Sequence, residues 1–104
     1  MDSSLFDWDE GNITHLAEHD VTPGEAEEVL LGDAFELEMQ VAETGEQRLL
    51  QLGETAEGRI LQLLSTWRGE KLRVISAWDA PRQLKIYYLE QMRQQYGDSQ
   101  GPEL

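Results

Sequence analysis

The chain contains no cysteine, only two lysines and no long apolar run. Without cysteine it can form neither a disulfide nor a thiolate metal site, which is compatible with a reducing compartment. No apolar stretch approaches the roughly 20 residues that a membrane-spanning helix needs. The N-terminal residues also lack the positive start and the apolar core of a secretory signal. We therefore expect a cytoplasmic protein with no membrane contact.

Positive charge is absent from the first half of the chain. Residues 1–47 hold 14 of the 21 carboxylates and no lysine or arginine, so their formal charge is −14. Residues 48–104 hold all eight cations and seven carboxylates, which leaves a net charge of −13 for the whole chain. Nucleic-acid binding depends on cations that displace phosphate counterions. A nucleic acid can therefore dock only on the second half, and the simplest role of the acidic half is solubility.

The length and the C-terminal composition bound the domain organisation. A chain of 104 residues has room for one hydrophobic core. Residues 97–104 are rich in glycine, serine, aspartate and proline, a composition typical of disorder. We predict a single domain over residues 1–96 and a disordered tail over residues 97–104.

Two helices are predicted before the first long strand. Asp9 is placed to cap a helix that runs through His19, and its buried face is expected to contain Ile13, Leu16 and Ala17. The segment Thr22–Glu25 combines a threonine cap, a proline at the first helical position and a glutamate that closes a capping box. This second helix is expected to end at Gly32 and to bury Ala26, Val29 and Leu30.

Four strands follow the helices. From Phe35 to Val41, apolar residues alternate with glutamate and glutamine, as expected of a half-buried strand whose glutamate side faces water. The next strands are predicted over Arg48–Gly53, Arg59–Trp67 and Lys71–Ala77. The second of these is apolar on both parities, which is typical of a central strand covered on both sides. Short turns between the strands make them an antiparallel meander.

Each end of the chain adds one element. Phe6 and Trp8 alternate with aspartates and predict a short N-terminal strand with its aromatic side inward. Asp79 is placed to cap a C-terminal helix with Pro81 in its first turn. The apolar stripe of that helix consists of Leu84, Tyr87, Tyr88, Met92 and Tyr96. The predicted fold class is therefore α+β, with two N-terminal helices and one C-terminal helix packed on a four-stranded antiparallel sheet.

Two histidines lie on one side of the first predicted helix. His15 and His19 are four residues apart, but Leu16 occupies the position that holds glutamate in a H-E-x-x-H zinc helix. We therefore predict no metal site and no other cofactor. Histidine is the commonest general acid or base, which makes His19 a candidate. A histidine at a helix end more often serves as a cap or a hydrogen-bonding group.

The arginines are the other candidates for a site. A phosphodiester transition state needs fixed cationic donors, and arginine supplies them in a planar, permanently charged fork. Arginines on alternating strand positions are also commonly solvated, so their spacing leaves both readings open. The candidates are Arg48, Arg59, Arg68, Arg73 and Arg82.

A series of short segments between Phe6 and Arg82 resembles a known family. The segments are Phe6-Asp7-Trp8-Asp9-Glu10, Asn12, His19 with Val21, Glu25-Ala26-Glu27-Glu28-Val29, Asp33, Gly45-Glu46-Gln47-Arg48, Gly53, Gly58-Arg59-Ile60-Leu61, Thr66, Arg68-Gly69, Arg73-Val74-Ile75-Ser76-Ala77, Ala80 and Arg82. In this order they are similar to the BrnT family of toxins from type II toxin–antitoxin systems.

The resemblance implies a compact fold related to RelE-type ribonucleases and RNA cleavage without a metal. It also implies neutralisation by a BrnA-like antitoxin that binds DNA through a ribbon-helix-helix domain, so the toxin itself is not expected to bind DNA. The family pattern assigns His19, Arg48 and Arg73 to a catalytic, RNA-facing site. It assigns Arg68 and Arg82 to phosphate contacts. A homodimer or a heterotetramer with the antitoxin fits these expectations.

Two positions depart from the family pattern. Glu18 stands where a lysine usually precedes the histidine, and Trp78 stands where an arginine usually follows the Ser-Ala pair of the last strand. The simplest structural roles are a solvated helix charge for Glu18 and packing for Trp78. A single lost phosphate contact costs on the order of 3 kcal/mol, roughly a hundredfold in rate. Two functions therefore stay open: an active ribonuclease toxin and a degenerate, non-catalytic relative that binds a protein partner.

Overall fold

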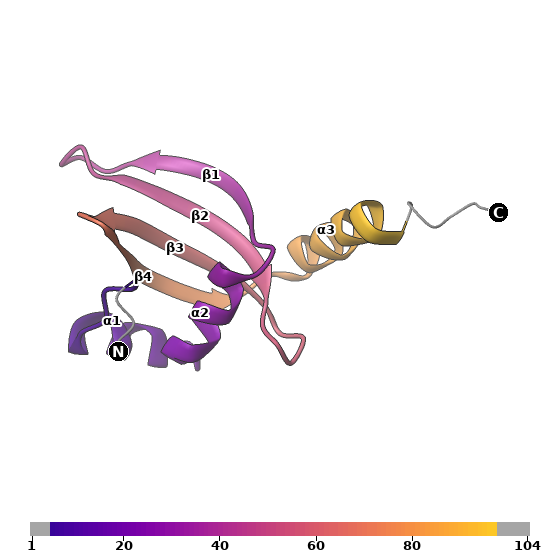
Figure 1. Ribbon diagram of the computed structural model, residues 1–104, viewed down its shortest axis with the longest axis horizontal. Helices are drawn as coiled ribbons and strands as arrows, with labels where there is room; N and C mark the ends of the chain where they lie inside the picture. Colours follow the sequence, from indigo (N-terminus) through magenta and orange to yellow (C-terminus); the bar gives the residue numbers. More distant parts are fainter. Residues whose placement is uncertain (1–4, 98–104) are drawn as a thin grey trace.

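The computed structural model describes residues 5–97, and the side chains of residues 5–95. Its elements are α1 (Glu10–Ala17), α2 (Pro23–Leu31), β1 (Phe35–Val41), β2 (Gln47–Glu54), β3 (Ile60–Arg68), β4 (Lys71–Asp79), α3 (Arg82–Met92) and a π-helical turn at Arg93–Gly97 (Figure 1). The predicted α+β class is confirmed. Residues 98–104 of the predicted tail lie outside the described residues, and the single domain over residues 1–96 stays a prediction.

The four strands form one sheet in the order β1-β2-β3-β4, and every neighbouring pair is antiparallel. This confirms the predicted meander. The N-terminal segment extends the sheet beyond β4, because Phe6 forms a parallel bridge with Leu72. The amide of Leu72 donates to the carbonyl of Leu5 over 2.8 Å, and the amide of Asp7 donates to the carbonyl of Leu72 over 3.0 Å. The predicted N-terminal strand is thus a single bridge, with Phe6 buried.

Both N-terminal helices begin at the predicted caps. The side chain of Asp9 accepts from the amide of Asn12 over 3.2 Å, and the side chain of Asn12 accepts from the amide of Asp9 over 2.8 Å. Thr22 and Glu25 form the same reciprocal arrangement at α2, and Gly32 is the C-cap as predicted. Such pairs satisfy amides that a helix start leaves without partners.

The predicted end of α1 is wrong, and its predicted buried face is only partly correct, because Leu16 is buried as predicted. The helix stops at Ala17, two residues before His19, and the chain then turns through Asp20, whose φ is 58°. Ile13 and Ala17 are exposed, whereas Asn12 is buried. The physical reason is that Asn12 donates to the carbonyls of Asp7 and Val74 over 2.9 and 3.0 Å, which fixes its side of the helix against β4.

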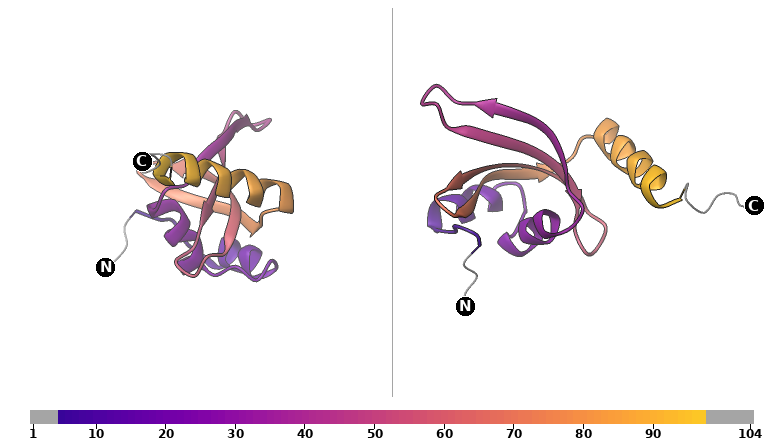
Figure 2. Two further views of the ribbon diagram at one scale, coloured as in Figure 1. Left: turned by 90° about the vertical axis from the view of Figure 1, so that its right-hand side faces the viewer. Right: turned by 45° about the horizontal axis from the view of Figure 1, so that its top comes forward.

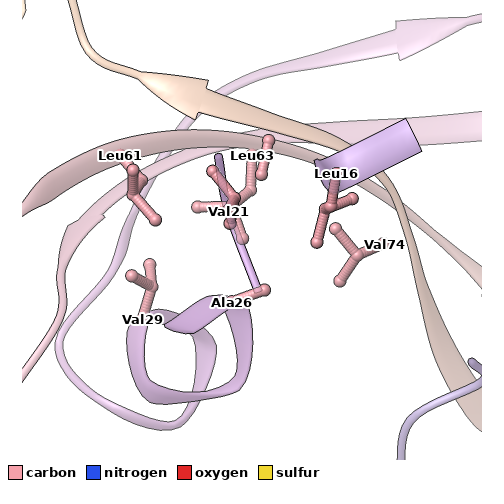
Figure 3. Packing of buried hydrophobic residues seen from close by; sticks show 8 residues of the cluster. Leu16, Val21, Ala26, Val29, Leu61, Leu63 and Val74 are labelled. Carbon is pink, nitrogen blue, oxygen red and sulfur yellow. The ribbon is translucent and has the colours of Figure 1, made fainter. Parts of the chain in front are cut away.

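The main core lies between the sheet and the two N-terminal helices. Figure 3 shows side chains from α1, α2, β3 and β4 converging in this layer. Its buried members are Leu16, Val21, Ala26, Val29, Leu61, Leu63, Val74 and Ala77. Gly53 on β2 lets α2 approach the sheet closely, because a Cβ there would meet Val29 Cγ1 at 2.7 Å and the Cα of Ala34 at 3.2 Å. The covered face of the sheet is therefore the face that carries Leu61, Leu63 and Gly53.

A second apolar cluster joins α3 to one end of the sheet. Its buried members are Leu52, Ile60, Ala80 and Tyr88, with Phe35, Leu37, Leu84 and Met92 packed around them. The rings of Phe35 and Tyr88 have centroids 5.5 Å apart. Figures 1 and 2 show α3 beyond the end of the sheet, away from α1 and α2. The helix is thus held mainly along one side.

The predicted buried face of β1 is only partly correct. Phe35 and Leu37 pack in the second cluster, but Met39 and Val41 are 52% and 65% exposed. The register shifts between Glu36 and Glu38, so a bulge changes the alternation of the strand. Phe35 pairs with Leu52, and after the bulge Met39 pairs with Leu49. These two partners are an odd number of residues apart on β2, so Met39 lies on the opposite face of the sheet from Phe35.

Three details of β3, β4 and α3 also differ from the predictions. The start of β3 is buried as predicted, but Trp67 near its end is 54% exposed. Asp79 belongs to β4 and does not cap α3, because Arg59 occupies both of its carboxylate oxygens; the N-cap is Pro81, without a side-chain hydrogen bond. Tyr87 is 42% exposed and lies off the buried stripe.

Among the described residues, no helix has the length and apolar character to cross a membrane.

Candidate functional site

The sheet face opposite α1 and α2, which we call the open face, collects cations at one end. Leu63 faces the core, so alternation places Thr66 and Arg68 of β3 on the open face. Their partners across the strand pair are Arg73 and Lys71 of β4. On β2, Gly53 faces α2, which places Arg48 on the open face as well. We call Arg48, Arg68, Lys71 and Arg73 the open-face cations.

A single carboxylate connects two of these cations. Glu46 precedes β2 and places Oε1 3.0 Å from Nε of Arg48 and Oε2 3.1 Å from Nε of Arg68. The hydrogen bond from Arg48, followed by the bond from Arg68, lowers the pKa of Glu46. The carboxylate therefore stays ionised and bridges the turn before β2 to the end of β3.

Arg73 has two carboxylate partners from the N-terminal segment. Its terminal nitrogens donate to both oxygens of Asp9 over 3.0 Å each, and Nη1 lies 3.5 Å from Asp7. Hydrogen bonding to Arg73, together with the amide of Asn12, lowers the pKa of Asp9. The same contact raises the pKa of Arg73. Arg73 thus holds the residue that caps α1 and also lies on the open face.

His19 lies in a different part of the molecule, beside Trp78. The ring of His19 is exposed, with its centroid 6.4 Å from that of His15 and 6.4 Å from that of Trp78. Trp78 donates its indole N–H to the side-chain oxygen of Gln62 over 2.8 Å. This bond joins neighbours across β3 and β4 and orients the half-buried indole on the open face. The contacts of Trp78 are thus with Gln62 and His19, and its expected packing role stays a prediction.

The guanidinium of Arg59 is occupied by contacts within the fold. It contacts Asp79 through Nε over 2.9 Å and Glu25 through Nη1 over 3.1 Å. It also donates to the carbonyls of His19 and Asp20 over 3.3 and 2.6 Å. Hydrogen bonding to Asp79 is the main cause of its raised pKa. This arginine ties β3 to β4, to α2 and to the turn after α1.

The remaining residues assigned from the resemblance are solvent-exposed. Glu18 is the C-cap of α1, next to His19, and Arg82 is the first residue of α3. Neither side chain has a hydrogen-bond or ion-pair partner within residues 5–95. Arg82 follows the β4 end that carries Trp78 and Asp79, whereas Arg48 and Arg68 lie at the opposite end of the sheet.

The structure therefore separates the assigned residues into two groups. Arg48, Arg68 and Arg73 lie together at the end of the sheet formed by the β1–β2 and β3–β4 turns. His19 and Trp78 lie towards the α3 end, and Trp78 is five residues along β4 from Arg73, about 16 Å at the rise of a strand. His19 does not contact Arg48 or Arg73, so a single catalytic set made of these three residues stays a prediction.

The carboxylate partners of the arginines were not identified from the sequence. Glu46 and Asp9 are separated from Arg68 and Arg73 by 22 and 64 residues. The strand register and the N-terminal bridge bring each carboxylate to its arginine, and no local sequence pattern predicts such contacts. Within the part of the chain that the structure describes, no three His, Cys, Asp or Glu side chains gather as metal ligands.

These features define a small α+β protein that displays most of its sheet cations on one face of an otherwise acidic chain. Residues 8–83 match the family described as the ribonuclease toxin BrnT of type II toxin–antitoxin systems. The chain belongs to the BrnT family, because this match covers well over half of its length. Membership confirms the resemblance and implies an antitoxin partner. A comparison with curated proteins finds no match.

Proposed function

We propose that the chain is a metal-independent ribonuclease toxin that binds RNA on the open face. The observation that carries this proposal is the strand register, which gathers Arg48, Arg68, Lys71 and Arg73 on one sheet face. The open face lies opposite α2, whose three glutamates repel a polyanion. Fixed guanidinium groups stabilise the charge that develops on phosphorus during phosphodiester cleavage.

Trp78 supports RNA as the substrate. Single-stranded RNA is bound by sheets that combine cations for the backbone with aromatic rings for the bases. Trp78 presents such a ring on the same face as the open-face cations, at a fixed orientation set by Gln62. An RNA strand that contacts both groups lies along β4, with its bases at Trp78 and its phosphates at Arg73.

His19 is the side chain in this region best suited to proton transfer, because histidine serves as a general acid or base. Its ring lies beside Trp78 and is exposed to solvent. A nucleotide stacked on Trp78 therefore places its sugar and phosphate within reach of His19. Glu18, the neighbouring anion, takes the place of the family's lysine and weakens phosphate binding at this end.

The experiment is expression of the full chain without its antitoxin, followed by incubation of the purified protein with RNA in the presence of EDTA. We expect growth arrest and RNA cleavage. Arg48→Gln combined with Arg68→Gln should reduce cleavage by about a hundredfold. Gln83→Glu combined with Gln94→Glu lowers the net charge equally on exposed positions of α3 and of the π-helical turn that follows it, and should leave cleavage unchanged. Normal growth together with intact RNA contradicts the proposal.

A second candidate function is supported by the pairing of the sheet arginines. Glu46 holds Arg48 and Arg68, and Asp9 holds Arg73, so these cations are partly neutralised within the chain. A degenerate member that binds its partner without cleaving RNA fits this observation, together with Glu18 and Trp78. Glu18→Lys combined with Trp78→Arg distinguishes the two functions: toxicity that appears only in this variant supports a loss of catalysis in the parent.

The antitoxin expected on this proposal is BrnA-like, with a ribbon-helix-helix domain. An adjacent reading frame with that pattern supports this partner. Co-purification of its product with the toxin tests the pairing directly.

A further inference from the structure

The C-terminal helix α3 has a second stripe of side chains, on the side that faces away from the apolar cluster on which the helix packs. The inner stripe, which packs on the sheet, consists of Leu84, Tyr88 and Met92. The outer stripe consists of Arg82, Ile86, Leu89 and Arg93 at spacings of four, three and four residues. At 100° per residue, the outer stripe is centred roughly 130° from the inner one. Arg93 follows the last residue of α3 as its C-cap and keeps the helical backbone conformation. We call these four residues the outer stripe of α3.

All four residues of the outer stripe are exposed. Ile86 and Leu89 are 44% and 55% exposed, although apolar side chains at helical spacing are normally buried. Figures 1 and 2 show that no other element lies over this helix among the described residues. The stripe thus presents two adjacent apolar side chains with an arginine at each end.

The two arginines of the outer stripe differ from the other four arginines of the chain. Arg48, Arg59, Arg68 and Arg73 each contact at least one carboxylate. Arg82 and Arg93 have no ion-pair or hydrogen-bond partner for their side chains within residues 5–95. In a chain with 21 carboxylates and eight cations, two arginines on one stripe without a partner among the described residues leave the helix locally basic.

From this arrangement we propose that the outer stripe of α3 is a docking surface for an acidic amphipathic helix of the antitoxin. Such a helix would place two apolar residues against Ile86 and Leu89 and a carboxylate beside each of Arg82 and Arg93. The matching pattern is an acidic residue, an apolar residue four later, another apolar residue three later and a second acidic residue four after that. The spacing reads the same in both directions, so it fits a parallel or an antiparallel partner helix.

A second copy of α3 does not satisfy the outer stripe. In an antiparallel pair of these helices, Arg82 of one copy would lie opposite Arg93 of the other, and in a parallel pair each arginine would face its own counterpart. Both arrangements bring like charges together, which disfavours the contact. A carboxylate-bearing partner converts the same positions into complementary pairs.

Most of this docking surface lies beyond the shared family region, and the surface does not depend on the nuclease activity. The family match ends at residue 83, so Ile86, Leu89 and Arg93 lie outside it. The proposal requires only an antitoxin partner, which membership of the family implies. Loss of RNA cleavage would therefore overturn the proposed nuclease and leave the docking surface in place.

The test uses the full chain co-expressed with the protein encoded by the adjacent gene, and measures their dissociation constant by calorimetry. Ile86→Ser combined with Leu89→Ser should weaken binding by about a hundredfold at any salt concentration. Arg82→Gln combined with Arg93→Gln should weaken it by about tenfold at low salt and less at high salt. The matched control is Gln83→Glu with Gln94→Glu, which makes the same charge change off the stripe and should alter binding by less than about threefold.

Far-UV circular dichroism of each variant checks that α3 still folds. Hydrogen exchange of the wild-type complex should show added protection of the amides of residues 82–93. The proposal is overturned if the wild type does not bind the neighbouring product, or if both stripe variants bind like the control. It is also overturned if the stripe variants lose only RNA binding or only self-association, measured with a synthetic RNA and by light scattering.

Discussion

Arg73 donates its two terminal nitrogens to the two carboxylate oxygens of Asp9, each over 3.0 Å. Asp9 caps α1, so a residue assigned to RNA binding also secures the first helix. The contact joins Arg73, a β4 residue on the open face, to the start of α1 in the helix layer that covers the other face. Substitution of Arg73 consequently affects both stability and any role in RNA binding, and the two effects need separate measurements.

Asp9→Ala should lower the melting temperature by several degrees, because it removes both the helix cap and the partner of Arg73. Thermal unfolding monitored by circular dichroism measures the change. Glu10→Ala removes the next exposed carboxylate, in the first turn of α1, and should lower the melting temperature by a smaller amount, about 1–3 °C. Equal shifts for the two variants would show that the capping box and the Arg73 contact add nothing.

Glu46→Gln should strengthen RNA binding if the proposed function is correct. The substitution removes the anion that holds Arg48 and Arg68 while leaving a side chain of the same size. Two released cations should increase the affinity and make the slope of log affinity against log salt more negative by one to two, as roughly one unit per phosphate contact predicts. Fluorescence anisotropy of a labelled RNA over a salt series measures both quantities. Unchanged affinity and slope would show that these arginines do not face RNA.

Asp79→Asn should destabilise the protein by about 1 kcal/mol at neutral pH, a modest value because the Asp79 side chain is 57% exposed. Hydrogen bonding to Arg59 lowers the pKa of Asp79 in the folded state. Its stabilising contribution is therefore complete above the unfolded pKa of about 4 and disappears as the pH falls through the lower folded value. Urea unfolding of both proteins between pH 7 and pH 3 should show a difference that shrinks below pH 4. A difference that grows on acidification would contradict this assignment.

Gly53→Ala should destabilise the protein by about 1–3 kcal/mol through overpacking between β2 and α2. The new Cβ would lie 2.7 Å from Val29 Cγ1, and the backbone of Ala34 limits its escape. In a Val29→Ala background the added cost of Gly53→Ala should fall, which a double-mutant cycle measures. Gly24→Ala is the matched control, because its Cβ would have no atom closer than 3.9 Å.

Sodium chloride should raise the melting temperature between about 20 mM and 500 mM, because it screens repulsion among carboxylates. Several carboxylates from α1 to the turn after β1 have no side-chain partner within the described residues: Glu10, Glu18, Asp20, Glu36, Glu38 and Glu43. An increase of about 5 °C corresponds to roughly 1 kcal/mol for a domain of this size. A melting temperature that falls with salt would show that the ion pairs outweigh the repulsion.

Local patterns were sufficient for most of the fold. The caps at Asp9 and Thr22, the glycine at the end of α2 and the bounds of β1 follow from interactions within a few residues, and the structure confirms them. The sequence pattern failed where a distant contact intervened. The bulge in β1 exposes Met39. The hydrogen bond from Arg59 to Asp79 prevents Asp79 from capping α3.

The candidate site divides in the same way. The resemblance named Arg48, Arg68 and Arg73, and the register places all three on the open face. The resemblance could not show that His19 lies beside Trp78, away from the sheet arginines, or that Glu46 bridges Arg48 and Arg68. Those facts depend on which strands pair and where the chain crosses them.

By itself, the sequence determined the family, the α+β class, the order of the strands and the confinement of cations to the second half, because each depends on residue identity or on short-range periodicity. Only the tertiary structure decided which arginines share a face, which carboxylates neutralise them and which side of α3 remains uncovered. These properties arise from contacts between residues tens of positions apart, whose geometry is set by the packing of the whole chain.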